Sequence, residues 1–120
     1  MPKFMLLMQH APHKYQKMSP DELQKTMARY QVWNDEIRSS DRYVSSDKLQ
    51  EEGGKVVSLT SGRLTVTDGP YSETKEVVGG YFMFRAANYE EALDLVRDHP
   101  FLADGTIVLR QVDPQSCGGP

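Results

Sequence analysis

Three histidines are the side chains of this sequence best suited to proton transfer near neutral pH, because imidazole titrates in that range. His10 and His13 stand three positions apart just after a strongly apolar segment, and His99 lies near the other end of the chain. A general acid or base would therefore come from His10 or His99, with Asp68 as the carboxylate that orients it. We predict His10, Asp68 and His99 as the catalytic candidates.

Each histidine also has a second interpretation. His10 and His13 can share a metal ion that His99 or Asp68 completes, but protein metal sites usually need three or four converging ligands. We therefore predict neither a metal site nor a cofactor. His99 can instead cap the C-terminus of a helix, where the helix dipole favours its positively charged form.

The motif Asp68-Gly69-Pro70-Tyr71 is typical of a rigid turn, because aspartate, glycine and proline each favour turn geometry. This turn either aims the polar run that follows it into a binding cavity or leaves that run as a solvated loop. An aromatic residue on a helix stripe can be a pocket wall or part of the core, and an arginine on a strand can bind an anion or pair with a carboxylate. The predicted ligand-binding residues are Trp33, Tyr71, Glu73, Lys75, Glu76 and Arg110.

Charge and hydropathy exclude several classes of function. The net charge is −3, with 14 basic residues scattered singly among 17 acidic ones, whereas nucleic-acid binders concentrate positive charge on one face. No apolar run approaches the roughly 20 residues of a membrane span, and no signal-peptide pattern opens the chain. The sequence thus predicts a cytoplasmic protein without nucleic-acid or membrane partners. Cys117, the single cysteine, excludes an internal disulfide and is a poor nucleophile in a glycine-rich tail.

A chain of 120 residues suits one domain, and we place it at residues 1–113, followed by a flexible tail at 114–120. Ser19-Pro20 and Asn88 are typical helix starts. Hydrophobic periodicity, turn residues and these caps predict strands at 3–9, 42–49, 56–59, 64–67, 81–85 and 106–112, and helices at 20–39 and 89–98. The glycine pair at 79–80 is expected to precede its strand.

This order is βαβ, hairpin, βαβ, which predicts an α+β, ferredoxin-like fold with an antiparallel sheet and both helices on one face. The segments 4–8 and 81–84 are apolar on both faces of their strands. A single sheet would leave one of these faces in water, so we predict that a second copy of the chain covers it. The expected assembly is a homodimeric α+β barrel with a ligand cleft between the subunits.

The run from Asp68 to Glu76, followed by Gly79-Gly80-Tyr81, resembles the signature of the DGPF proteins, a branch of the YCII-related family. The opening segment 1–7, the helix segment 90–93 and the closing segment 105–110 fit the same pattern, so the resemblance covers about residues 1–113. It implies a dimeric α+β barrel. It implies little about activity, because a fold does not fix a function.

The resemblance also implies which enzyme features are missing. The YCII branch is enzyme-like through a histidine in the first helix and an aspartate in an Asp-Pro pair after the second. Here the helix at 20–39 has no histidine, and the corresponding pair is His99-Pro100. That dyad does not transfer to this chain. We predict a small dimer that binds a polar or aromatic molecule near the Asp68–Tyr71 turn, with lyase-like acid–base chemistry. The alternative is a non-catalytic dimer that senses a ligand or interacts with and regulates another protein.

Overall fold

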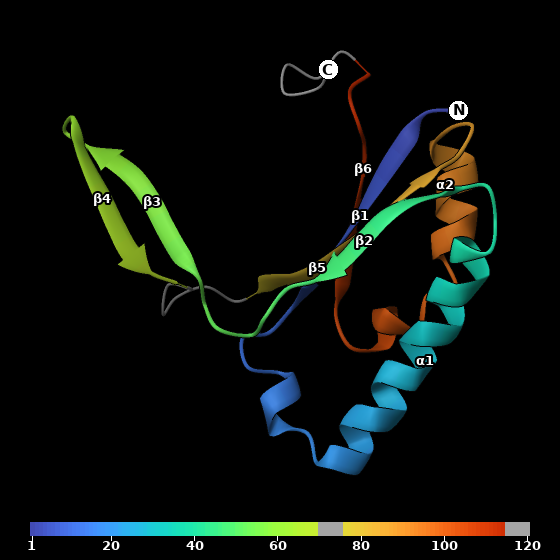
Figure 1. The fold of residues 1–120 in the computed structure, drawn as a ribbon, viewed down its shortest axis with the longest axis horizontal. Coiled ribbons are helices and arrows are strands. Elements are labelled where there is room, and N and C mark those ends of the chain that lie inside the picture. Colours follow the sequence, from blue (N-terminus) through green and yellow to red (C-terminus); the bar gives the residue numbers. More distant parts are fainter. Residues whose placement is uncertain (70–75, 115–120) are drawn as a thin grey trace.

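A computed structural model describes residues 1–69 and 76–114 (Figure 1). The strands are β1 (Lys3–His10), β2 (Tyr43–Lys48), β3 (Lys55–Thr60), β4 (Arg63–Asp68), β5 (Val77–Arg85) and β6 (Thr106–Gln111). The helices are α1 (Pro20–Arg38) and α2 (Tyr89–Val96), with short 3-10 helices η1 (Tyr15–Lys17) and η2 (Pro100–Ala103). In the described part of the chain, neither α-helix is long and apolar enough to cross a bilayer.

The main sheet has the strand order β2-β5-β1-β6, and every neighbouring pair is antiparallel. This order places β1 and β5 at the centre, where both faces of a strand can be buried, as their unbroken apolar runs predicted. Strands β3 and β4 form a separate two-stranded sheet (Figure 1). The predicted α+β, ferredoxin-like architecture is confirmed.

Helix starts follow the predicted capping residues. Ser19 Oγ accepts a hydrogen bond from the Glu22 N–H (3.2 Å), and Asn88 Oδ1 accepts one from the Glu91 N–H (2.9 Å). These bonds satisfy donors that a helix N-terminus otherwise leaves unpaired. Helix α2 ends at Val96, two residues earlier than predicted.

Gly79 and Gly80 lie inside β5, so the prediction that they precede the strand was wrong. The ladder with β1 continues through Met8↔Gly80 to His10↔Val77, with a register shift after Met8. A Cβ atom at Gly79 would stand 2.3 Å from His10 Nε2. Glycine is therefore required here because the imidazole of the neighbouring strand lies directly over it.

One core fills the face of the sheet that carries both helices. Its largest fully buried side chains on the sheet are Phe4, Leu6, Phe82 and Phe84. Helix α1 adds Trp33 and Ile37 to this core, and α2 adds Ala92 and Val96. The opposite face, which we call the open sheet face, carries half-buried Met5, Leu7, Tyr81, Met83 and Val108 in neighbouring cross-strand positions.

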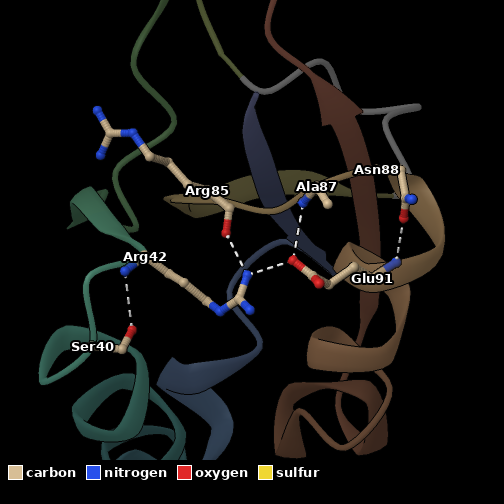
Figure 2. A network of polar contacts seen from close by, with 6 residues as sticks. All are labelled: Ser40, Arg42, Arg85, Ala87, Asn88 and Glu91. Carbon is tan, nitrogen blue, oxygen red and sulfur yellow. Dashed lines mark hydrogen bonds and ion pairs between the residues drawn. The ribbon is translucent and has the colours of Figure 1, made fainter. Parts of the chain in front are cut away.

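Arg42 holds the start of β2 to the end of β5 and the first turn of α2 (Figure 2). Its Nη1 donates to Glu91 Oε1 (2.6 Å) and to the Arg85 carbonyl oxygen (3.1 Å). The same Glu91 oxygen accepts a bond from the Ala87 N–H (2.9 Å). The Ala87 N–H and the Arg42 guanidinium together hold the pKa of Glu91 below its ordinary value. One carboxylate thus ties a strand, a loop and a helix N-terminus together.

We expect Arg42→Ala to lower the melting temperature at neutral pH, because it leaves the Arg85 carbonyl and the Glu91 carboxylate without this donor. A carboxylate with a depressed pKa stabilises the fold above the ordinary value of 4.5 and loses that contribution as the pH falls. The effect of Arg42→Ala should therefore shrink in acid. Arg97→Ala, which breaks an exposed pair with Asp94, is the control and should change stability by less than about 1 kcal/mol. Thermal melts of both variants at neutral and acidic pH test this prediction. A loss of melting temperature in Arg42→Ala that is the same at both pH values would contradict it.

Candidate functional site

A cavity of about 240 Å³ lies between α1 and the central strands, on the face of the sheet that the helices cover. Aromatic and imidazole rings make up much of its lining: His10, Tyr15, Tyr30, Phe82, His99 and Phe101. Polar residues also line it: Gln31, Asn34, Arg38, Ser46, Asp47 and Lys48. We call it the histidine cavity. Residues of one chain line it, and two of the predicted catalytic residues, His10 and His99, are among them.

His99 lines this cavity with only 3 % of its surface exposed. Its Nδ1 accepts a hydrogen bond from the Phe101 N–H (3.0 Å), so a neutral ring carries its proton on Nε2. Burial lowers the pKa of His99 to about 4, which keeps the ring neutral at physiological pH. The alternative role as a positively charged helix cap was therefore wrong.

The Nε2 atom of His99 is buried and has no hydrogen-bond partner among the described residues. Leaving a buried N–H unpaired costs about 1–3 kcal/mol. Trp33 packs against the His99 ring, with 4.4 Å between the ring centroids, but this contact does not give Nε2 a hydrogen-bond acceptor. An unpaired donor on the lining of a cavity is what a ligand oxygen or nitrogen would satisfy.

His10, with 3 % of its surface exposed, lines the same cavity from the end of β1. Its Nδ1 donates to the Ala11 carbonyl oxygen (2.8 Å), which leaves Nε2 with the lone pair in a neutral ring. Tyr15 packs edge-on against this ring at 4.8 Å. His10 is thus held as a proton acceptor, whereas His99 is held as a donor, and the cavity contains both kinds of imidazole.

Tyr30 connects α1 to the loop before β6. Its hydroxyl donates to Asp104 Oδ2 (2.5 Å), so the Tyr15 hydroxyl, 3.4 Å away, donates in turn to Tyr30. Burial raises the pKa of Tyr30 well above its ordinary value, with the Asp104 carboxylate adding to the shift. Burial likewise raises the pKa of Tyr15. Both phenols stay protonated and fix the wall next to the histidines.

Two cations lie on the polar part of the histidine cavity. Arg38, exposed at the end of α1, donates from Nη2 to Ser46 Oγ (2.8 Å). Lys48 Nζ lies 5.9 Å from the centre of the Tyr15 ring, within reach of a cation–π contact. Aromatic walls with arginine and lysine beside them suit a planar ligand that carries acidic oxygens.

A second cavity, of about 310 Å³, shares His10 and Gly79 with the first. Its other walls are mainly the segment 49–54 and the start of β5. His13 lines it but is exposed and donates from Nδ1 to Gln16 Oε1 (3.0 Å). Within residues 1–69 and 76–114, no three His, Cys, Asp or Glu side chains are grouped to hold a metal ion.

The remaining predicted site residues in the described part of the chain do not line the histidine cavity. Asp68, 84 % exposed at its side chain, ends β4 and pairs with Lys55. Glu76 is exposed and accepts a bond from Thr106 Oγ1 (3.4 Å), and exposed Arg110 lies beside Met5 on the open sheet face. None of these residues lines either cavity. Trp33 is a core residue whose Nε1 donates to the Leu95 carbonyl oxygen (3.0 Å).

Three predicted ligand-binding residues, Tyr71, Glu73 and Lys75, lie outside the described residues, as does Cys117. The prediction of a turn at Asp68–Tyr71 falls partly outside them as well. The Gly69 N–H within that motif donates to the Gly54 carbonyl oxygen (3.0 Å), which closes the base of the β3–β4 hairpin.

Four residues near the histidines were not predicted from the sequence as site residues: Tyr15, Asp104, Arg38 and Lys48. Tyr30 and Asp104 are 74 positions apart, and no local pattern indicates their contact. The available signal for Tyr15 was its place in the histidine-containing segment after the first strand. For Arg38 it was its position at the end of the amphipathic helix that faces the sheet.

Comparison with known proteins identifies the family. The chain is 44% identical over 39 residues to an uncharacterized protein, R00369, of Rhizobium meliloti (strain 1021), and the match spans about a third of each protein. The fold is similar to that of 5-chloro-2-hydroxyhydroquinone dehydrochlorinase (TftG) from Burkholderia phenoliruptrix AC1100, solved in complex with 2,5-dihydroxybenzoquinone. That likeness has a TM-score of 0.53 at 11% identity and covers 92% of this chain and 93% of the other. The model of the YCII-related domain matches residues 2–116, and the chain therefore belongs to the YCII-related family.

Proposed function

We propose that this protein binds a small planar molecule with acidic oxygens in the histidine cavity and performs lyase-like acid–base chemistry on it. The observation that carries the proposal is the His99 Nε2–H, buried on the cavity lining without a partner. A ligand oxygen placed there would receive a hydrogen bond. The cost of leaving the N–H unpaired in the free protein would then be recovered on binding.

The chemistry follows from which ring nitrogen carries the proton when both imidazoles are neutral: Nδ1 in His10 and Nε2 in His99. An elimination needs a base that removes a proton from carbon and a donor that stabilises charge on a neighbouring oxygen while the leaving group departs with its electron pair. His10 Nε2 has the lone pair for the first task, and the His99 N–H suits the second. Asp68 does not line the cavity, so we assign the acid–base roles to the two histidines alone.

Similarity to a dehydrochlorinase adds support for the ligand class. The name of that protein states an elimination of hydrogen chloride, and its structure holds a one-ring dihydroxyquinone. A cavity of about 240 Å³ with aromatic walls suits a ligand of one ring. Arg38 and Lys48 would pair with its acidic oxygens.

The open sheet face supports the second part of the proposal, a homodimer. Met5, Leu7, Tyr81, Met83 and Val108 form a continuous apolar surface on two central strands and an edge strand. Such a surface is costly to leave in water, and a second copy of the chain would cover it.

We expect His99→Asn to weaken binding of 2,5-dihydroxybenzoquinone by roughly tenfold to a hundredfold, because a hydrogen bond to a charged group contributes about 1.5–3 kcal/mol. Asparagine can still accept the Phe101 N–H but does not reach as far as Nε2 of the ring. Isothermal titration calorimetry at pH 7 measures the effect. His13→Asn, at an exposed histidine outside the histidine cavity, is the control and should bind like the parent.

Two results would contradict the proposal. Parent-like affinity of His99→Asn would show that the ligand does not use the unpaired N–H. Absence of binding by the parent protein would exclude one-ring quinones as the ligand class.

A further inference from the structure

The β3–β4 hairpin has one apolar and one polar face. Val57 pairs directly with Val66 and Leu59 with Leu64, so these four side chains lie on the same face of the hairpin. They are 60 %, 55 %, 72 % and 69 % exposed, respectively. The opposite face is mostly polar: Ser58 pairs with Thr65 and Thr60 with Arg63, while Val56 pairs with Thr67. We call Val57, Leu59, Leu64 and Val66 the apolar face of the hairpin.

The described rest of the same chain leaves the apolar face of the hairpin exposed. Figure 1 shows the hairpin standing away from both helices, beyond the far side of the main sheet. Two-stranded hairpins are at best marginally stable in water on their own. A hairpin with four exposed aliphatic side chains therefore needs a surface to pack on.

The two strands of the hairpin are held together at its base. The Gly69 N–H donates to the Gly54 carbonyl oxygen (3.0 Å), and Lys55 pairs with Asp68. A Cβ atom at Gly69 would stand 2.7 Å from the Gly53 carbonyl oxygen, so the two chain segments are closely packed there. These contacts join the two strands, while the described rest of the chain leaves the apolar face of the hairpin exposed, so the surface that it packs on comes from another molecule.

A second copy of this chain offers a surface of the same kind. Its open sheet face carries half-buried apolar side chains on three neighbouring strands, and Figure 1 places the hairpin on that side of the sheet. The apolar face of one hairpin exposes roughly 400 Å², a size at which a patch marks an interaction site. Two reciprocal hairpins and the surfaces they cover would bury roughly 1,600 Å², the area of a stable interface.

We propose that the β3–β4 hairpin is an arm whose apolar face packs on the open sheet face of a second copy, reciprocally in a closed twofold dimer. The inference rests on the proposed homodimer and adds that the β3–β4 hairpin holds its two chains together. Reciprocal exchange closes the assembly at two copies, whereas one-way packing would build a chain of molecules.

Sedimentation equilibrium of the double variant Leu59→Glu, Leu64→Lys tests the arm. We expect its dimer dissociation constant to rise at least a hundredfold over the parent. The matched control Ser58→Glu, Thr65→Lys places the same charges on the polar face of the hairpin and should stay within threefold. Far-ultraviolet circular dichroism checks that both variants fold.

The outcomes separate the two proposals. A parent with the mass of one chain, 13.6 kDa, would overturn both the homodimer and the arm. A dimeric parent with an equally dimeric Leu59→Glu, Leu64→Lys variant would overturn the arm alone. Growth beyond two copies with rising concentration would overturn the reciprocal packing.

Cross-linking identifies the surface under the arm. In a Cys117→Ser background, chains carrying Leu59→Cys are mixed with chains carrying Tyr81→Cys and oxidised. We expect disulfide-linked heterodimers, and none when Ser58→Cys replaces Leu59→Cys. Cross-links only between two Leu59→Cys chains would show that hairpins pack on each other and would overturn the assignment of the open sheet face.

Discussion

The free energy of unfolding should fall by roughly 3 kcal/mol as the pH is lowered from about 6.5 to about 4, because His99 is buried as a neutral ring. Its pKa is lowered from 6.5 to about 4 by desolvation in the folded state. Between these values the unfolded chain binds a proton that the folded chain does not. Stability from this group is therefore complete above pH 6.5 and is lost as the pH falls through the folded pKa.

Urea unfolding across this pH range measures the slope. His99→Asn is the control, since asparagine accepts the Phe101 N–H without titrating, and most of the slope between pH 6.5 and 4 should disappear in it. Glu91, whose pKa is also lowered, loses its contribution only below its ordinary value of 4.5 and leaves most of this window unaffected. An unchanged slope in His99→Asn would show that the ring is not buried as a neutral group.

The architecture was predictable from local patterns because each pattern has a direct physical cause. Apolar residues without alternation at 4–8 indicate a strand covered on both faces, and β1 is central in the sheet. Ser19 and Asn88 marked helix starts because their side chains accept bonds from free N–H groups. Gly79 and Gly80 were predicted to precede their strand, since glycine weakens strand interiors. Here the reason for glycine is a histidine on the neighbouring strand, which only the tertiary structure brings there.

The two histidines of the candidate site could be selected from the sequence by residue type, but their hydrogen-bond partners could not. His10 and His99 were selected because imidazole titrates near neutrality, and both line one cavity. The two neutral rings carry their protons on different nitrogens because His10 Nδ1 faces the Ala11 carbonyl and His99 Nδ1 faces the Phe101 N–H. The folded backbone sets the positions of both groups. Asp68 was chosen as the orienting partner because its turn motif stands out in the sequence, but in the chain it pairs with Lys55.

We expect Gly79→Ala to destabilise the fold by about 1–3 kcal/mol, the usual cost of overpacking, and to weaken 2,5-dihydroxybenzoquinone binding at least tenfold. The new Cβ would stand 2.3 Å from His10 Nε2 and 2.6 Å from Cδ2, so the imidazole must move out of its place. All three nearest atoms to that Cβ belong to His10. The loss of binding would thus report the displaced proton acceptor.

The His10→Ala background separates this contact from a general effect on β5. Because the side chain that clashes is then absent, Gly79→Ala should cost little additional stability in that background, and the two changes should be strongly non-additive. Binding should stay weak in the double variant, since the proton acceptor is gone although the fold is restored. Urea unfolding of the four proteins, together with calorimetry, tests both statements. An equal cost of Gly79→Ala with and without the imidazole would show that His10 does not lie over Gly79, and the assignment of its Nε2 as the base in the histidine cavity would fail with it.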